Sequence, residues 1–174
     1  SSCDWSSDVC SSDLDAILYF FQNIWGNILK EVPKARIYLI GANPPKKIRN
    51  LDNGKNVFVT GEVPDVRPYI QKAAVCIAPL ISGAGLRGKV IEYAALRRTF
   101  VATSIATTDL VFRDNIDYFC ADTAEDFSQK LTLLLNDSLK AKQMAISAYE
   151  TAFNHYDTGH LIKNLTRFYK HLEG

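Results

Sequence analysis

The sequence predicts an α/β fold, a Rossmann-like, doubly wound parallel sheet covered by helices on both faces. From residue 15 onward, short apolar runs of strand length alternate with longer segments whose apolar residues recur at helical spacing. The short runs are apolar almost throughout, which is typical of strands buried on both faces. Short apolar strands that alternate with helices are the pattern of βαβ units, so we expect a parallel sheet.

Residues 1–14 differ in composition from the rest of the chain. They include six serines and show no apolar periodicity. Residues 8–14 (DVCSSDL) also resemble the translation of a sequencing adapter. We therefore predict that 1–14 is a sequencing or assembly artefact and that 15–174 forms one domain with helices at its C-terminal end.

The first predicted elements are a helix and two strands. Residues 17–29 carry apolar side chains at helical spacing, and Val32-Pro33 ends that helix. The apolar runs 36–40 and 56–60 are predicted strands, each followed by a glycine, and the loop between them contains two prolines. The apolar residues of the helix are Ile17, Leu18, Phe21, Ile24, Trp25, Ile28 and Leu29.

The middle of the chain continues the alternation. We expect a short helix over 66–73 with Asp65 as its cap, then a strand at 75–80. A helix over about 89–97 and strands at 100–103 and 118–120 follow.

Three helices are predicted to close the chain. Asp122 and Glu125 have the spacing of a capping box before a first helix, and a second helix spans about 138–153. The third is indicated by four apolar residues on one face, Leu161, Leu165, Phe168 and Leu172.

The most informative stretch is the loop that leaves the 75–80 strand and enters the next helix. Gly83, Gly85 and Gly88 let a ligand approach the backbone closely. Backbone N–H groups and the positive end of the helix meet there, which favours a phosphate. The sequence therefore predicts an anionic ligand at this loop.

The pattern of the loop suggests three specific interpretations, of which the first is excluded. Gly83 to Lys89 fits a P-loop, but Val90 stands where magnesium needs Ser or Thr, which excludes it. The glycines also fit a dinucleotide fingerprint, although the next strand ends without the acidic residue that binds a ribose. In the third, Glu92 grips the two hydroxyls of a ribose and Lys89 neutralises a diphosphate; a plain Lys89–Glu92 surface pair is the alternative.

Four segments, in order, resemble the C-terminal domain of group 1 (family 4) glycosyltransferases of the GT-B fold. They are residues 33–41, 57–69, 78–94 and 101–103, so the resemblance covers nearly all of 15–174. It implies a glycosyltransferase that binds a nucleoside-diphosphate sugar and transfers a hexosyl group with retention, without a metal cofactor. It implies a donor site made of Gly61, Val63, Ser82, Gly83, Ala84, Gly85, Leu86, Arg87, Lys89, Val90 and Glu92.

Within that site, the resemblance implies that Glu92 binds the ribose and that the loop at 83–85 binds the diphosphate and the sugar. Gly61 and Val63 would lie near the base. Arg87 and Lys89 match basic positions that would stabilise the leaving diphosphate. Arg97-Arg98-Thr99 stand where the family has Gly-x-Pro, so no glycine is available to end that helix.

The resemblance also predicts what this chain lacks. The central first strand of a 3-2-1-4-5-6 sheet should precede residue 15, where the anomalous segment stands, so we expect it to be missing and the chain to be marginally stable. The acceptor, a glycan or a lipid-linked glycan, belongs to an absent N-terminal domain, so no catalytic base is assigned. An oxidoreductase domain that binds NAD(P) and a non-catalytic nucleotide-binding module remain the alternatives.

Composition excludes several other classes. The 47% of apolar residues suit one core, and a net charge of +1 argues against binding nucleic acid. No apolar run approaches the ~20 residues that span a bilayer, and no secretory signal opens the chain. Four cysteines and three histidines lack metal-ligand spacing. Free thiols predict a reducing compartment, hence a cytoplasmic protein, either free or peripheral at the inner face of the membrane.

Overall fold

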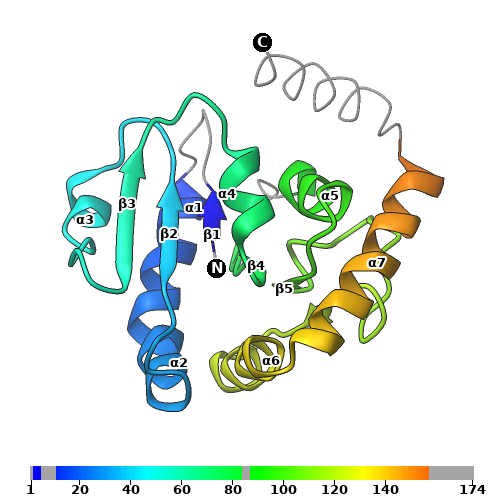
Figure 1. Cartoon of the computed structure of the whole chain (residues 1–174). Coiled ribbons are helices and arrows are strands. Elements are labelled where there is room, and N and C mark those ends of the chain that lie inside the picture. The colour runs from blue at the N-terminus through cyan, green and yellow to red at the C-terminus, as the bar shows by residue number, and fades with distance from the viewer. Residues whose placement is uncertain (1, 5–10, 84–86, 157–174) are drawn as a thin grey trace, which may run out of the picture.

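The computed structural model describes residues 2–4, 11–83 and 87–156, with side chains described from residue 14 on except that of Arg87. Figure 1 shows the arrangement of its helices and strands. The strands are β1 (Ser2–Asp4), β2 (Ile37–Ile40), β3 (Val57–Gly61), β4 (Cys76–Ala78), β5 (Phe100–Ala102) and β6 (Phe119–Cys120). The helices are α1 (Ser11–Phe20), the π-helical turn η1 (Phe21–Trp25), α2 (Gly26–Glu31), α3 (Lys46–Arg49), α4 (Arg67–Lys72), α5 (Arg87–Ala95), α6 (Ala124–Asn136) and α7 (Ser138–His155).

The described strands form one sheet in the order β3-β2-β1-β4-β5-β6, and every recorded pairing is parallel. This is the strand order of a doubly wound fold whose direction reverses between β1 and β4. The predicted fold class is confirmed.

The central strand corrects one expectation, that the first strand is missing. Ser2–Asp4 occupies that place and pairs with Tyr38, Leu39 and Ile40 on one side and with Cys76 on the other. Pairing in a sheet is made by backbone groups, so a polar segment can fill a gap between two strands that both need hydrogen-bonding partners. Residues 11–14 likewise lie in the first turn of α1, and whether 1–14 arose as an artefact stays a prediction.

We expect that replacing Cys3 with proline strongly destabilises the domain. The change removes a backbone N–H from the middle of a central strand, where proline is not tolerated. The measurement is the midpoint of thermal unfolding, with Cys3→Ser as the matched control because serine keeps the N–H. Equal midpoints for the two variants would mean that β1 does not support the sheet.

Side chains from alternate strand positions fill two cores, one on each face of the sheet. Ile77 and Val101 pack with Ile24 and Phe127, and so face the layer that contains η1 and α6. The second core, on the other face, joins strand residues to α4, α5 and α7 and contains Cys76, Ala78, Phe100, Ala102, Ile70, Tyr93, Ala148 and Ala152. Because the strands are buried on both sides, they read as continuous apolar runs.

Most predicted elements are present within a few residues, and the differences are local. The prolines at 44 and 45 precede α3, a one-turn helix that was not predicted. Asp65 lies one residue before the N-cap position, and its carboxylate still accepts a hydrogen bond from the backbone N–H of Arg67 at 2.9 Å. The third C-terminal helix falls in 157–174, outside the described residues.

The cap of α6 is not Asp122, as the capping-box pattern predicted. Thr123 is the N-cap, and its hydroxyl accepts a hydrogen bond from the N–H of Asp126 at 3.2 Å. The carboxylate of Asp122 accepts instead from the N–H of Ser104, at 2.7 Å. The local pattern assigned the Asp122 carboxylate to the helix, but in the folded chain it bonds to a residue that is distant in sequence.

The end of α5 shows how a helix stops without glycine. Arg97 has a φ of 56°, in the left-handed region, and the N–H of Arg98 bonds to the carbonyl of Tyr93 at 2.9 Å. This is the hydrogen bond of a Schellman motif, with arginine in the position that glycine usually holds. The guanidinium carbon of Arg97 lies 4.4 Å from the centre of the Tyr149 ring on α7, a contact that offsets part of the strain.

A buried carboxylate joins the loop before β6 to α7. Asp117 is fully buried, and its oxygens accept hydrogen bonds from the guanidinium of Arg113 and from the hydroxyls of Ser147 and Thr151. Its own carbonyl accepts a bond from Thr99, next to β5. Burial acts to raise the pKa of Asp117, but the bonds from Arg113 and Ser147 outweigh burial and hold that pKa below its ordinary value.

Candidate functional site

Four of the predicted donor residues, Gly61, Val63, Ser82 and Gly83, lie at or just beyond the carboxyl ends of β3 and β4. Gly61 ends β3 with a φ of 70°, and its carbonyl accepts a hydrogen bond from the N–H of Gly41, the residue after β2, at 3.2 Å. Val63, two residues further on, is partly exposed. In parallel sheets with this strand order, ligands bind outside the carboxyl edge near the reversal point between β1 and β4.

The glycine loop begins where β4 leaves the core. Leu80 is fully buried, whereas Ile81, Ser82 and Gly83 are exposed, and Gly83 has a φ of 81°, which favours glycine. The chain therefore turns sharply outward at the point where the sequence predicted a ligand. Ala84, Gly85 and Leu86 lie outside the described residues, and Arg87 is described by its backbone alone.

Thr103, just after β5, holds the start of this loop and was not predicted as a site residue. Its hydroxyl donates to the carbonyl of Leu80 at 2.6 Å, and its N–H bonds to the carbonyl of Ala78 at 3.2 Å. A threonine at the end of a buried strand was the sequence signal. Its partner, 23 residues earlier in the chain, is defined only by the tertiary structure.

The predicted donor residues on helix α5 differ in their exposure to solvent. Lys89 and Glu92 are each partly buried, at positions three residues apart that share one side of the helix. Val90 is fully buried and packs in the core with Tyr93 and Ala94, so its side chain serves packing and does not face a ligand. The Tyr93 hydroxyl donates to the carbonyl of Ile77 at 3.5 Å, which fixes α5 against β4.

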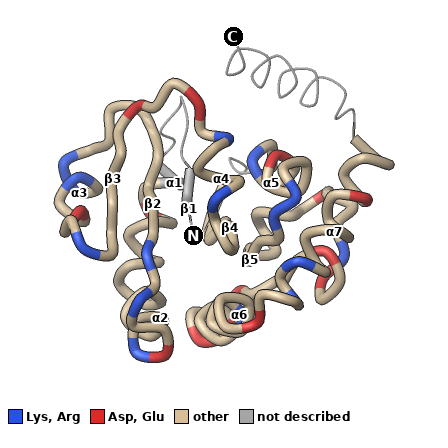
Figure 2. The backbone as a smooth tube through the Cα atoms, in the orientation of Figure 1, with Lys and Arg blue, Asp and Glu red and all other residues tan. Residues whose placement is uncertain are grey.

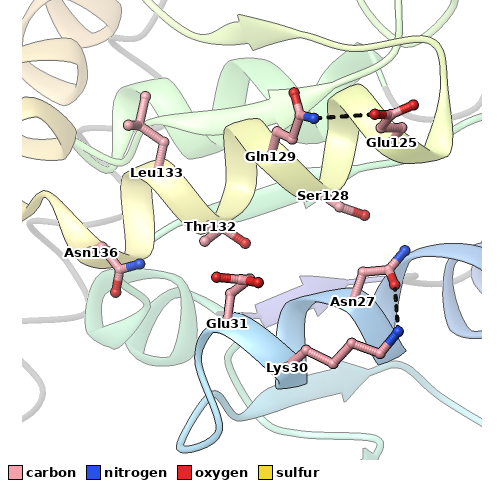
Figure 3. Close-up of a pocket in the computed structure, with 9 residues that line it drawn as sticks. All are labelled: Asn27, Lys30, Glu31, Glu125, Ser128, Gln129, Thr132, Leu133 and Asn136. Carbon is pink, nitrogen blue, oxygen red and sulfur yellow. Dashed lines mark hydrogen bonds between the residues drawn. The ribbon is translucent and has the colours of Figure 1, made fainter.

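One pocket of about 510 Å³ lies elsewhere, between α2 and α6. Figure 3 shows the residues that line it, Asn27, Lys30, Glu31, Glu125, Ser128, Gln129, Thr132, Leu133 and Asn136. None of these residues belongs to the predicted donor site. The Gln129 amide donates to Glu125 and the Lys30 ammonium to Asn27, each at 3.4 Å, so part of the lining is paired within its own helix.

The distribution of charge does not favour binding of a macromolecular polyanion. Figure 2 shows basic and acidic residues interspersed along the described chain, without a continuous basic stripe. In the described ranges, no three His, Cys, Asp or Glu side chains come close enough together to hold a metal ion. Over the same ranges, none of the helices has the combination of length and apolar character that crossing a bilayer requires.

Among the cysteines whose side chains the structure describes, Cys76 and Cys120 are free thiols. Cys76 is buried in the sheet, and Cys120 is partly exposed at the end of β6. Burial and the nearby carboxylate of Asp122 raise the pKa of the Cys120 thiol. A raised pKa keeps this thiol protonated and unreactive, as expected of a packing residue.

Solved structures with the same fold are glycosyltransferases and a sucrose-phosphate synthase. The C-terminal domain of LpcC, a group 1 glycosyl transferase from Francisella tularensis, has a TM-score of 0.69 at 13% identity, over 88% of this chain and 84% of that one. TarM from S. aureus, solved with fondaparinux, alpha-GlcNAc-glycerol and UDP, has a TM-score of 0.69 at 16% identity, over 95% of this chain and 34% of that one. Sucrose-phosphate synthase from Thermosynechococcus elongatus has a TM-score of 0.70 at 13% identity, over 98% of this chain and 45% of that one.

These coverages show that the chain spans about a third to a half of the longer structures and corresponds to most of one isolated C-terminal domain. Among curated proteins, no sequence matches the chain significantly. The model of the family described as glycosyl transferases group 1 matches residues 8–137, most of the chain. The family match, the strand order and the glycine loop agree, and the chain belongs to the group 1 glycosyltransferases.

Proposed function

We propose that this chain is the part of a group 1 glycosyltransferase that binds a nucleoside-diphosphate sugar, and that the complete enzyme transfers a hexosyl group with retention to a glycan or lipid-linked glycan. The observation that carries the proposal is the loop from β4 to α5, which turns outward at Gly83 beside the reversal point of the sheet. Parallel sheets of this order hold nucleotides there. TarM, a structural neighbour, was solved with UDP.

The spacing of the sheet suits an extended ligand. Three strand intervals separate β3, which ends at Gly61, from β4, a distance of about 14 Å at ~4.8 Å per interval. In the proposed mode the base lies near Gly61 and Val63, the ribose contacts Glu92, and the diphosphate reaches the glycine loop. A base, a ribose and a diphosphate joined end to end can bridge such a span.

The proposed chemistry requires stabilisation of the departing diphosphate. Negative charge builds on that group as the glycosidic bond breaks, and fixed N–H groups at the start of a helix stabilise it without reorganisation. Arg87 and Lys89, in the first turn of α5, add positive charge. We propose that these groups act without a bound metal. A cytoplasmic location for the enzyme remains a prediction.

Titration of the full chain with nucleotides tests the proposal. We expect UDP or GDP to bind with micromolar to millimolar affinity, because part of the cleft belongs to another domain, and binding to be unaffected by EDTA. NADH serves as the control, since a dinucleotide site would prefer it. Binding of NADH in preference to both UDP and GDP would reject the proposal.

A further inference from the structure

One side chain joins the ends of β4 and β5 at the carboxyl edge of the sheet. The last recorded bond of the ladder runs from the N–H of Thr103 to the carbonyl of Ala78, at 3.2 Å. In a parallel ladder the carbonyl of Leu80 would then accept from the N–H two residues further along, at Ile105. The hydroxyl of Thr103 makes this bond instead, at 2.6 Å.

The bond from the side chain lets β5 end while the residues after β4 stay fixed. The chain enters a turn directly after Thr103, and the N–H of Ala106 bonds to the Thr103 carbonyl at 3.1 Å. The hydroxyl of Thr107 lies 3.3 Å from the same carbonyl and 3.0 Å from the hydroxyl of Tyr118, just before β6. Thr103, Thr107 and Tyr118 are all buried, so the Thr103 side chain is held from both sides.

The bond to Leu80 sets the direction of the next backbone N–H. The carbonyl of Leu80 and the N–H of Ile81 belong to one planar trans peptide unit, so they point in opposite directions. In the sheet, β4 lies between β5 and β1 (Figure 1). Because the Leu80 carbonyl points to Thr103 at the end of β5, the N–H of Ile81 points to the β1 side, where the direction of the sheet reverses.

The backbone at the start of the loop offers N–H groups to a ligand. Leu80 is fully buried, whereas the three residues that follow it are exposed. Among the hydrogen bonds recorded for the part of the chain that the structure describes, none has the N–H of Ile81, Ser82 or Gly83 as its donor. An exposed N–H that is held in one direction is a preorganised donor, and phosphate oxygens are suitable acceptors for it.

We propose that Thr103 is a positioning residue for the nucleotide. Through the Leu80 carbonyl it aims the N–H of Ile81 at the reversal point of the sheet, where this N–H donates to a phosphate oxygen of the nucleoside diphosphate. The inference rests on the function proposed above and names a backbone group that the phosphate meets there. Thr103 is only 7% exposed, so it acts through Leu80 and not by contact with the ligand.

Three variants test the role of the hydroxyl. Thr103→Val removes it at nearly constant volume and leaves the buried Leu80 carbonyl without its donor, whereas Thr103→Ser keeps it. Thr99→Val is the matched control, because Thr99 is also buried and its hydroxyl donates to the carbonyl of Asp117 at 3.1 Å, at the opposite end of β5. Both valine variants lose the same kind of buried bond, but only Thr103→Val loses it beside the loop.

Nuclear magnetic resonance relaxation of the ligand-free full chain gives a readout that needs no nucleotide. In the wild type, in Thr103→Ser and in Thr99→Val, the backbone order parameter of Ile81 is expected to be close to the value of about 0.85 for a rigid backbone. In Thr103→Val it should fall below about 0.6, the range of a flexible one. A rigid Ile81 in Thr103→Val would overturn the proposal.

Nucleotide binding gives the second readout. Titration of the wild type with UDP or GDP should shift the amide resonance of Ile81, a measurement that needs no variant. The same nucleotide should bind about tenfold more weakly to Thr103→Val, and within about threefold of wild-type affinity to Thr103→Ser and Thr99→Val. Thermal melts establish that each variant is folded.

Two results of the titrations would overturn the proposal. One is an Ile81 amide that does not respond to a bound nucleotide. The other is an equal loss of affinity in the two valine variants, which would show a general effect of destabilisation. A wild-type chain that binds neither UDP nor GDP would reject the proposed function and with it the phosphate contact, while the order parameters would still decide whether Thr103 holds the peptide between Leu80 and Ile81.

Discussion

Replacing Glu92 with alanine is expected to weaken the binding of UDP or GDP by about 10- to 100-fold. A hydrogen bond to a charged group contributes ~1.5–3 kcal/mol, and each 1.4 kcal/mol corresponds to a factor of ten in affinity. Glu92 is partly buried on α5, one and a half turns from its start, on the side shared with Lys89. Isothermal titration of the variant and the wild type measures the loss.

A matched change separates this effect from a general loss of negative charge. Glu125→Ala removes an exposed carboxylate on α6, where it lines the pocket between α2 and α6, and should leave nucleotide affinity unchanged. The conservative Glu92→Gln keeps an acceptor but loses the charge, so its affinity should fall between those of the wild type and Glu92→Ala. Wild-type affinity in both Glu92 variants would show that Glu92 does not bind the ribose, and the proposed orientation of the donor would then be wrong.

Replacing Asp117 with alanine is expected to lower the free energy of unfolding by roughly 3 kcal/mol. Ser147 and Thr151 would lose their buried acceptor, and the guanidinium of Arg113 would lose its bidentate partner. For a domain of this size the midpoint of thermal unfolding should fall by roughly 6–12 °C. Denaturant titration measures the free energy directly.

The control for Asp117 is a carboxylate in a solvent-exposed pair. Asp126 pairs with Lys130 at 2.8 Å, and its side chain is 41% exposed. Because such pairs contribute at most about 1 kcal/mol, Asp126→Ala should have a much smaller effect. Similar losses in the two variants would mean that the buried network does not stabilise the fold.

The pH dependence gives the Asp117 prediction a second readout. The pKa of Asp117 is lower in the folded chain than its usual value of about 3.9 in an unfolded one, so acid protonates the unfolded state first. The stabilisation is therefore complete above the unfolded value and is lost as the pH falls through the folded one. The difference in stability between the wild type and Asp117→Ala should shrink below about pH 4.

The sequence predicted the periodic elements well because the causes are local or depend on simple burial. Runs such as 100–103 are apolar throughout, since Phe100 and Ala102 enter one core and Val101 the other. The outward turn at Gly83 was also predictable, since only glycine adopts such a backbone without strain. The fold class follows from the first of these features, whereas the family was indicated by the resemblance of four segments and is shown by the family match.

The differences arise where a distant group competes with a local pattern. Asp122 has the spacing of a cap, but the N–H of Ser104, 18 residues earlier, holds its carboxylate. The resemblance assigned Val90 to the donor site, although its side chain is fully buried beside Tyr93. The end of α5 lacks glycine, and Arg97 adopts the left-handed conformation there with its guanidinium over the ring of Tyr149 on α7.

The sequence by itself determined that the chain forms an α/β domain with parallel strands and a glycine turn suited to an anion. The tertiary structure decided which segment completes the sheet, which of two neighbouring polar residues caps α6, and that Thr103 fixes the start of the loop. The physical reason is the range of each interaction. Periodicity and backbone freedom act over a few residues, whereas strand pairing and buried hydrogen bonds join groups whose proximity exists only after the chain has folded.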